Sequence, residues 1–227
     1  MNPTLAVIGA GGHARVIADT ARETGEWEHI EFYDDTWPQE SFSGDWPLVG
    51  QLQDLLNTQP RDSLQLIVAS GDNQRRHALQ SRLEGLGWIM ATLIHPDACI
   101  SSGATLEPGC IVMAGVVINF GVTIGAASII NTRASVDHDC YLGNAVHISP
   151  GATLCGKVCI GDRTWVGAGA VVVQNIRMGS DSIIGAGATV LEDIPDDVVA
   201  VGCPARQIKS APCVSRKPAN SLRQDSK

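Results

Sequence analysis

The strongest constraint on the fold is a six-residue repeat that runs without insertion from Ile100 to Pro195. Each of the sixteen hexads begins with Ile, Leu, Val or Met, and the fifth position of each is small or apolar. This period fits neither a helix, whose apolar stripe recurs about every 3.6 residues, nor a simple strand, which alternates about every 2. A short strand followed by a tight corner fits it. Three such sides close a triangular coil of eighteen residues, so the hexads predict about five coils stacked ~4.8 Å apart.

The composition supports a narrow coil. The chain has 227 residues with 24 Gly but only ten aromatic residues, and fourteen of the glycines and three of the rings fall within the hexads. Large rings do not fit inside a three-sided prism. The fourth position is Gly in seven hexads, which predicts a corner there.

Residues 1–97 have a different pattern. Short apolar runs at 5–8, 30–33, 66–69 and 90–94 predict four strands, and helices are expected at 15–22 and 74–83. Alternating strands and helices predict a small α/β, Rossmann-like domain, with a looser excursion at 36–60. We interpret His77, beside Arg75 and Arg76, as part of a solvated helix face, with a contact to a nucleotide phosphate as the alternative.

A glycine turn follows the first predicted strand. Gly9, Gly11 and Ala14 fit the pattern G-x-G-x-x-A, and Asp34 lies twenty residues beyond Ala14 at the end of the second strand. Such a turn offers backbone amides to a phosphate, and the acid reaches a ribose hydroxyl. A NAD-binding oxidoreductase is therefore one hypothesis. However, four strands make only half of a dinucleotide fold, which favours binding of the mononucleotide part of a substrate. Tight packing of the turn alone remains a third interpretation.

Charge and cysteine content exclude several classes of protein. The net charge of −8 argues against nucleic acid or anionic membrane as a partner. No window approaches the ~20 apolar residues of a membrane span, and the N-terminus does not resemble a signal peptide, so we expect a cytoplasmic protein. Seven cysteines without a C-x-x-C pair argue against disulfides or structural zinc, and no other spacing predicts a metal site.

Asp137, His138 and Asp139 interrupt the seventh hexad. His138 stands at the third position, outside the two inward positions, so core packing does not explain it. Neutral imidazole accepts a proton near pH 7, and a carboxylate fixes its tautomer. Because successive strand side chains point apart, a bond between His138 and Asp139 requires the corner to lie between them. A solvated polar corner is the alternative.

Four features together resemble bacterial nucleotide-sugar N-acetyltransferases, such as those of bacillosamine synthesis, and the related sialic acid O-acetyltransferases. They are the hexads, the turn Gly9-Ala-Gly-Gly-His13, the pair Asp34-Asp35 and the triplet at 137–139. The resemblance covers nearly all of residues 4–208. It implies a left-handed parallel β-helix that works as a homotrimer and takes its acetyl group from acetyl-CoA.

The resemblance also implies roles for individual residues. His138 would be the catalytic base and Asp139, where relatives use Glu, its partner; the Gly156 amide, one coil beyond His138, would stabilise the oxyanion. Acetyl-CoA would contact His147, Ala168, Ala186 and Arg206 or Lys209. The nucleotide sugar would contact Gly11, Gly12, His13, Asp34 and Asp35, with Gly71, Asn73 and Asn131 as weaker candidates.

The sequence thus predicts a Rossmann-like domain at 1–97, a β-helix domain at 98–208 and a disordered tail at 209–227. The expected activity is N-acetylation of a nucleotide-linked amino sugar, most specifically a UDP-4-amino-4,6-dideoxy sugar. O-acetylation of a sialic acid or another sugar hydroxyl, a NAD-binding oxidoreductase and a non-catalytic scaffold are the alternatives.

Overall fold

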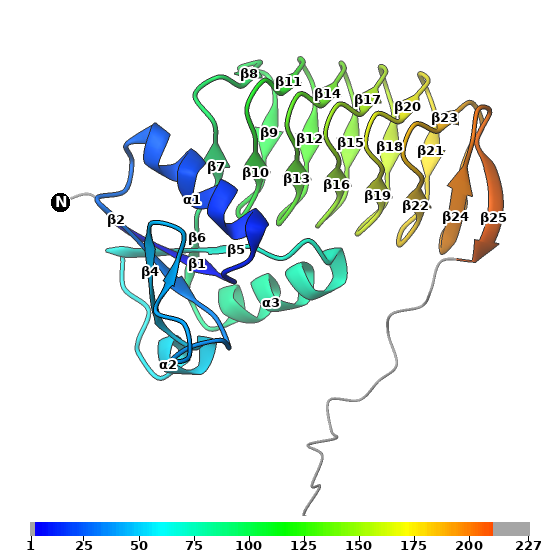
Figure 1. The fold of residues 1–227 in the computed structure, drawn as a ribbon. Helices are drawn as coiled ribbons and strands as arrows, with labels where there is room; N and C mark the ends of the chain where they lie inside the picture. The colour runs from blue at the N-terminus through cyan, green and yellow to red at the C-terminus, as the bar shows by residue number, and fades with distance from the viewer. Residues whose placement is uncertain (1–2, 211–227) are drawn as a thin grey trace, which may run out of the picture.

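The computed structural model describes residues 3–210, which form an α/β unit followed by a parallel β-helix (Figure 1). The α/β unit holds one six-stranded sheet of order β3-β4-β2-β1-β5-β6. Its strands are β1 (Thr4–Ile8), β2 (His29–Tyr33), β3 (Phe42–Ser43), β4 (Trp46–Gly50), β5 (Leu64–Val68) and β6 (Ile89–Met90). Its helices are α1 (Gly12–Thr24), α2 (Leu52–Leu56) and α3 (Asn73–Gly85). The predicted fold class is confirmed.

The sheet is buried on both faces, as expected of a parallel sheet. Leu5 and Val7 of β1 pack with α1, whereas Ala6 and Ile8 pack with Leu83 of α3. The predicted looser excursion at 36–60 was wrong for its middle part, because that segment contains β3, β4 and α2. β4 pairs with β2 in parallel and extends the sheet.

The apolar run at 90–94, predicted as one strand, is divided between the two units. The Ala91 amide donates to the Leu66 carbonyl of β5, and the Leu93 amide donates to the Cys110 carbonyl of the β-helix. The chain therefore changes its pairing partner within two residues, which an apolar pattern does not reveal. Strand β7 (Leu93–Ile94) is already part of the solenoid.

Three sheets form the sides of the β-helix, and each is named here by one central strand. The β16 sheet contains β7, β10 (Ile111–Val112), β13 (Ile129–Ile130), β16 (His147–Ile148), β19 (Trp165–Val166), β22 (Ile183–Ile184), β24 (Val198–Val201) and β25 (Arg206–Ser210). The β17 sheet contains β8 (Cys99–Ile100), β11 (Val117–Ile118), β14 (Ser135–Val136), β17 (Thr153–Leu154), β20 (Val171–Val172) and β23 (Thr189–Val190). The β18 sheet contains β9 (Thr105–Leu106), β12 (Thr123–Ile124), β15 (Tyr141–Leu142), β18 (Cys159–Ile160) and β21 (Arg177–Met178).

The register of these sheets confirms the eighteen-residue coil. Parallel partners are eighteen residues apart, as in the pairing of His147 with Trp165. The first and fifth hexad positions form the continuous core of the solenoid. The fourth position has positive φ in fourteen of the sixteen hexads, at six glycines and eight other residues. The corners predicted from the glycines therefore recur where the sequence has no glycine.

Helix α3 runs along one corner of the solenoid and hydrogen-bonds to successive coils. The Gln80 side chain donates to the Pro108 carbonyl at 2.8 Å, Arg76 donates to the carbonyls of Ala127 and Ala145, and Asn73 donates to that of Arg163 at 2.9 Å. These three residues share one helix face, and a helical turn rises by about 5.4 Å, close to the ~4.8 Å spacing of the coils. One face of α3 therefore contacts four coils.

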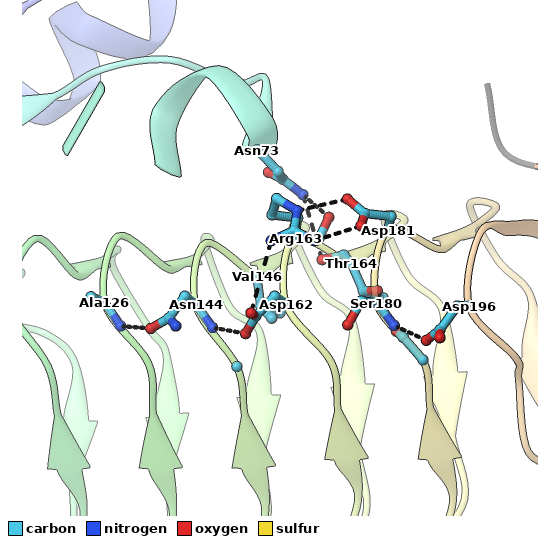
Figure 2. Close-up of polar contacts among 12 residues, drawn as sticks. Asn73, Ala126, Asn144, Val146, Asp162, Arg163, Thr164, Ser180, Asp181 and Asp196 are labelled. Atoms are coloured by element: carbon cyan, nitrogen blue, oxygen red, sulfur yellow. Dashed lines mark hydrogen bonds and ion pairs between the residues drawn. The ribbon is translucent and has the colours of Figure 1, made fainter. Parts of the chain in front are cut away.

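Polar side chains also link the coils along this corner (Figure 2). The backbone amide of Ala126 donates to the side-chain oxygen of Asn144, and the backbone amide of Asn144 donates to Oδ1 of Asp162 at 2.8 Å. Arg163 forms two hydrogen bonds with Asp181 in the next coil, at 2.7 and 2.6 Å. Polar groups left at the corner thus find partners one coil away.

Other expectations concern the ends of the chain and the membrane. Lys209 and Ser210 are the last residues of β25, which pairs antiparallel with β24, and the rest of the predicted disordered tail at 209–227 lies outside the described residues. Within residues 3–210, no helix has the length and apolar character needed to span a membrane. The same residues contain no group of three His, Cys, Asp or Glu side chains able to hold a metal ion.

Candidate active site

His138 lies at an exposed corner between β14 and β15. Its Nδ1 is 2.9 Å from Oδ2 of Asp139, whose positive φ of 58° lets the two neighbouring side chains meet. A carboxylate only accepts hydrogen bonds, so we assign the ring proton to Nδ1, which leaves Nε2 free to accept a proton. About half of each side chain is exposed to solvent. The corner therefore presents an oriented base to the outside.

Gly156 lies directly against this histidine. A Cβ placed on Gly156 would be 2.5 Å from Nε2 of His138, closer than side chains pack. No described residue accepts a hydrogen bond from the Gly156 amide. An accepting nitrogen and an unpaired backbone donor thus lie side by side, an arrangement suited to acyl transfer.

A second acid supports the backbone of His138. Oδ1 of Asp137 accepts from the His138 amide and from the side chain of Asn119, each at 2.8 Å. These hydrogen bonds lower the pKa of Asp137. Asn119 was not among the residues predicted from the sequence; its position eighteen residues before Asp137, one coil away, was the available signal.

The glycine turn joins β1 to α1 at the carboxyl edge of the parallel sheet. Gly9 has φ of +113° and approaches the carbonyl of Ala69, while Oδ2 of Asp34 accepts from the Ala10 amide at 3.0 Å. A pocket opens here, as expected at the carboxyl ends of parallel strands. Its lining includes Gly11, Asp34, Asp35, Ser70 and Arg75. Ser70 and Arg75 were not predicted as ligands from the sequence, and His77, for which a phosphate contact was the open alternative, is not part of this lining.

Five predicted contacts of the nucleotide sugar lie outside this lining, namely Gly12, His13, Gly71, Asn73 and Asn131. Gly12 begins α1 and Gly71 lies in the β5–α3 loop, and both are exposed. His13 instead points into the contact between the α/β unit and the β-helix. His13 therefore does not line the pocket together with Gly11, Asp34 and Asp35.

His13 lies near His147 and Arg76, close enough for their charges to influence one another. Burial, together with the charge of Arg76, lowers the pKa of His13 to about 4 and that of His147 to about 3, with His13 adding to the latter. Nε2 of His13 and Nδ1 of His147 are buried without a partner among the described residues. Nε2 of His147 lies 3.3 Å from the side-chain nitrogen of Asn131, and its ring stacks on Trp165. Both histidines are therefore neutral at pH 7.

Arg76 is 0% exposed, although it adjoins His77, which was interpreted as part of a solvated helix face and is half-buried. Burial lowers the pKa of Arg76 to about 10, so it remains a cation at neutral pH. A helical pattern taken alone does not show that a second unit covers this face. Its spacing from Asn73 and Gln80 was the available signal.

The remaining candidates lie at other places on the solenoid. Ala168 and Ala186 are exposed at one corner of neighbouring coils, with the Gly187 amide donating to the Ala168 carbonyl at 2.8 Å. Beside them, a Cβ placed on Gly169 or Gly187 would meet no atom within 4 Å, so the strip is open. Arg206 is exposed on β25. Within one chain, this corner and that of His138 lie at opposite ends of the β17 sheet strands.

Comparisons with known proteins agree with this division of the chain. Residues 4–83 match the PglD N-terminal domain, and residues 160–192 match the bacterial transferase hexapeptide (six repeats). The chain is 39% identical to the acetyltransferase domain of PglB from Neisseria gonorrhoeae FA1090, with a TM-score of 0.88, over 91% of this chain and 100% of that one. That domain has also been solved in complex with acetyl coenzyme A.

Two further relatives are named as N-acetyltransferases of amino sugars. A histidine-to-asparagine variant of perosamine N-acetyltransferase from Caulobacter crescentus, in complex with CoA and GDP-perosamine, is 37% identical, with a TM-score of 0.82, over 91% of this chain and 97% of that one. UDP-N-acetylbacillosamine N-acetyltransferase of Bacillus subtilis (strain 168) is 38% identical over 116 residues, 48% of this chain. The match spans about half the length of that curated relative, 51%.

A Rossmann-like unit, a β-helix of hexapeptide coils and a histidine at an open coil corner define the class of hexapeptide-repeat acyltransferases. The two matches at 37% and 39% identity, each covering 91% of this chain, narrow the assignment from this class of enzymes to one family. The chain belongs to the family of bacterial nucleotide-sugar N-acetyltransferases that carry a PglD-type N-terminal domain.

Proposed function

We propose that the protein transfers the acetyl group of acetyl-CoA to the amino group of a nucleotide-linked amino sugar, specifically a UDP-4-amino-4,6-dideoxy sugar. The observation that carries the proposal is the contact between Nε2 of His138 and Gly156, with Asp139 bonded to the other ring nitrogen. The related structures with CoA and GDP-perosamine support the two substrate classes. The proposal includes a cytoplasmic location, since both substrates are intracellular metabolites.

His138 and Gly156 divide the chemistry between them. Nε2 of His138 takes a proton from the sugar amine as its nitrogen bonds to the acetyl carbon, and Asp139 stabilises the imidazolium. The Gly156 amide donates to the carbonyl oxygen as that oxygen gains negative charge. When the carbon–sulfur bond breaks, His138 gives the proton to the leaving sulfur. Both substrates meet in one complex, and no covalent enzyme intermediate is needed.

The nucleotide part of the acceptor fits the pocket at the edge of the α/β sheet. Backbone amides of Gly11 and its neighbours at the start of α1 suit a phosphate, and Arg75 supplies a cation beside the same opening. Asp34 and Asp35 offer acceptors for ribose hydroxyls. His13, Gly12, Gly71 and Asn131 remain candidate contacts for the sugar.

The acetyl donor fits the open strip at Ala168 and Ala186, where small exposed residues leave room for a long thin chain. His147 would contact its acyl end and Arg206 its phosphates. Because the strip and His138 occupy different corners of one chain, a complete site needs a second copy. We therefore propose a homotrimer in which the strip of one subunit faces His138 of the next.

Thiol release from acetyl-CoA, followed over a panel of UDP-, GDP- and dTDP-linked amino sugars, tests the proposal. The expected product is an amide that survives hydroxylamine. A hydroxylamine-labile ester would instead show O-acetylation, and NAD binding without thiol release would indicate an oxidoreductase. Sedimentation should give a mass three times 23.9 kDa; an active monomer would exclude the shared site.

A further inference from the structure

Arg76 is a buried cation that no carboxylate pairs within the described residues. All of its hydrogen bonds go to neutral oxygens: Nη1 donates to Ser70 at 2.7 Å, Nη2 to Asn73 at 2.8 Å and to Ala145 at 2.9 Å, and Nε to Ala127. Burying a charge in this way is costly, and it is unnecessary for packing alone. The site therefore needs an explanation beyond stability.

The four acceptors belong to three separate parts of the molecule, since Asn73 is in α3, Ser70 is in the preceding loop and the two alanines are in the solenoid. Ser70 is in the β5–α3 loop and lines the pocket proposed for the nucleotide. Ala127 and Ala145 are corner residues of two neighbouring coils, and their positive φ of 59° and 52° sets the direction of their carbonyl groups. One planar guanidinium thus connects a wall of the nucleotide pocket directly to the solenoid, with fixed hydrogen-bond angles.

We propose that Arg76 is a positioning residue for the acceptor substrate: it holds the nucleotide-pocket loop in register with the coils, so that the sugar amine of a bound nucleotide sugar is presented to the catalytic corner. The inference rests on the proposed function. Arg76 acts through the Ser70 carbonyl and through α3, and it does not itself line the pocket.

The neighbours of Arg76 support this role. Asn73 and Gln80, on the same face of α3, bond to the coils on either side of those that Arg76 contacts. Among the titratable groups whose charges act on this region are His13, His147, Asp72 and Cys110. The two histidines are neutral and add no charge, and the Asp72 carboxylate raises the pKa of Arg76 without forming an ion pair with it, so the hydrogen bonds of Arg76 carry the connection.

The test compares Arg76→Lys and Arg76→Met with Arg82→Met, which removes an exposed arginine from the same helix. Arg76→Lys keeps the charge but loses the planar fork. We expect both Arg76 variants to raise KM for the nucleotide sugar and to lower kcat/KM by about 100-fold, because small displacements of a bound substrate have effects of this size. Affinity for acetyl-CoA, measured by calorimetry, should change much less than KM for the nucleotide sugar, since the α3 contacts do not reach the open strip at Ala168 and Ala186, although Arg76 lies near His147. Arg82→Met should behave as the wild type.

A milder variant covers the case in which Arg76→Met does not fold. Asn73→Ser removes one acceptor of Arg76 and the contact to the fourth coil, and it should raise KM in the same direction with a smaller effect. Folded Arg76 variants that lose thermal stability but keep wild-type KM for the nucleotide sugar would show a purely structural role and overturn the inference. Equal weakening for acetyl-CoA and nucleotide sugar would overturn it as well. Failure of the proposed function is distinct: the wild-type protein would then release no thiol with any nucleotide amino sugar.

Discussion

The imidazole of His138 occupies the space that a side chain at Gly156 would fill: a Cβ there would come within 2.5 Å of Nε2. The two residues are eighteen apart, so one coil supplies the imidazole proposed as the base and the next supplies the amide proposed as the oxyanion donor. The absence of a side chain at Gly156 is therefore part of the site and not just a property of the corner.

Gly156→Ala should displace the imidazole and leave the fold intact. The φ of Gly156 is not in the left-handed region, so alanine brings a contact without backbone strain. We expect kcat to fall about 100-fold, because the base and the oxyanion donor lose their alignment, and Tm to stay near the wild-type value. Gly85→Ala, at an open position, is the matched control. Wild-type kcat in Gly156→Ala would exclude this arrangement.

His138→Ala and Asp139→Asn separate the base from its partner. Removing the imidazole should reduce kcat by about 10²- to 10⁴-fold, the usual range for a general base. Asparagine tolerates the positive φ of Asp139, so Asp139→Asn removes the charge without distorting the corner. A smaller loss of kcat, with unchanged Tm, is expected. If steady-state assays show near-normal turnover for His138→Ala, another group is the base.

Stability should decrease in mild acid because of His13 and His147, each of which is half-buried. Their pKa values are lowered to about 4 and about 3 from an ordinary 6.5, so below pH 6.5 the unfolded chain binds protons that the folded protein does not. The free energy of unfolding is therefore lost as pH falls from 6.5 toward 4. Urea unfolding at pH 7, 6 and 5 measures the slope. His147→Asn should flatten it, whereas His29→Asn, at an exposed histidine, should not.

The ion pair between Arg163 and Asp181 should stabilise adjacent coils. Both residues have positive φ, so asparagine is the suitable replacement at each. Asp181→Asn should cost about 1 kcal/mol, since the pair is partly buried and makes two hydrogen bonds. A double-mutant cycle with Arg163→Asn isolates the coupling. Glu192→Gln, which removes an exposed pair with a separation of 3.8 Å, should cost almost nothing.

Ala186→Phe should block the open strip. If the acetyl donor lies there, its dissociation constant should rise at least about 10-fold, because the ring would occupy the volume of the bound chain. Ala186→Ser adds one atom and serves as the control. Calorimetry with CoA gives both values. Unchanged affinity in a folded Ala186→Phe variant would place the donor elsewhere.

The β-helix and the geometry of the corner at His138 could be predicted because both follow from a strict period. The hexad position and the coil number of a residue determine where it lies, so the relative positions of His138, Asp139 and Gly156 follow from their residue numbers. The observed contacts agree with these positions. Residues 42–56 were not predictable in this way, because short elements there lack a sustained pattern.

The contact between the two units was beyond sequence reasoning for a different reason. The sequence pattern predicts a helix at Arg76 and a turn at His13, and polar residues in either setting are ordinarily exposed. Their burial depends on where α1 and α3 lie against the coils, which no local pattern determines. The spacing of Asn73, Arg76 and Gln80 along α3 matches the spacing of the coils that they contact. This match can be recognised only when the coil spacing is known.

The hydrogen bonds from α3 end at the coil of Arg163 and Thr164. The coils that follow are attached to the molecule by their predecessors and by the closing strands β24 and β25. Insertion or deletion of whole eighteen-residue coils at that end would leave the contacts between α3 and the solenoid unchanged. Repeat number there is a variable that evolution or a protein engineer can change independently of where the acceptor binds.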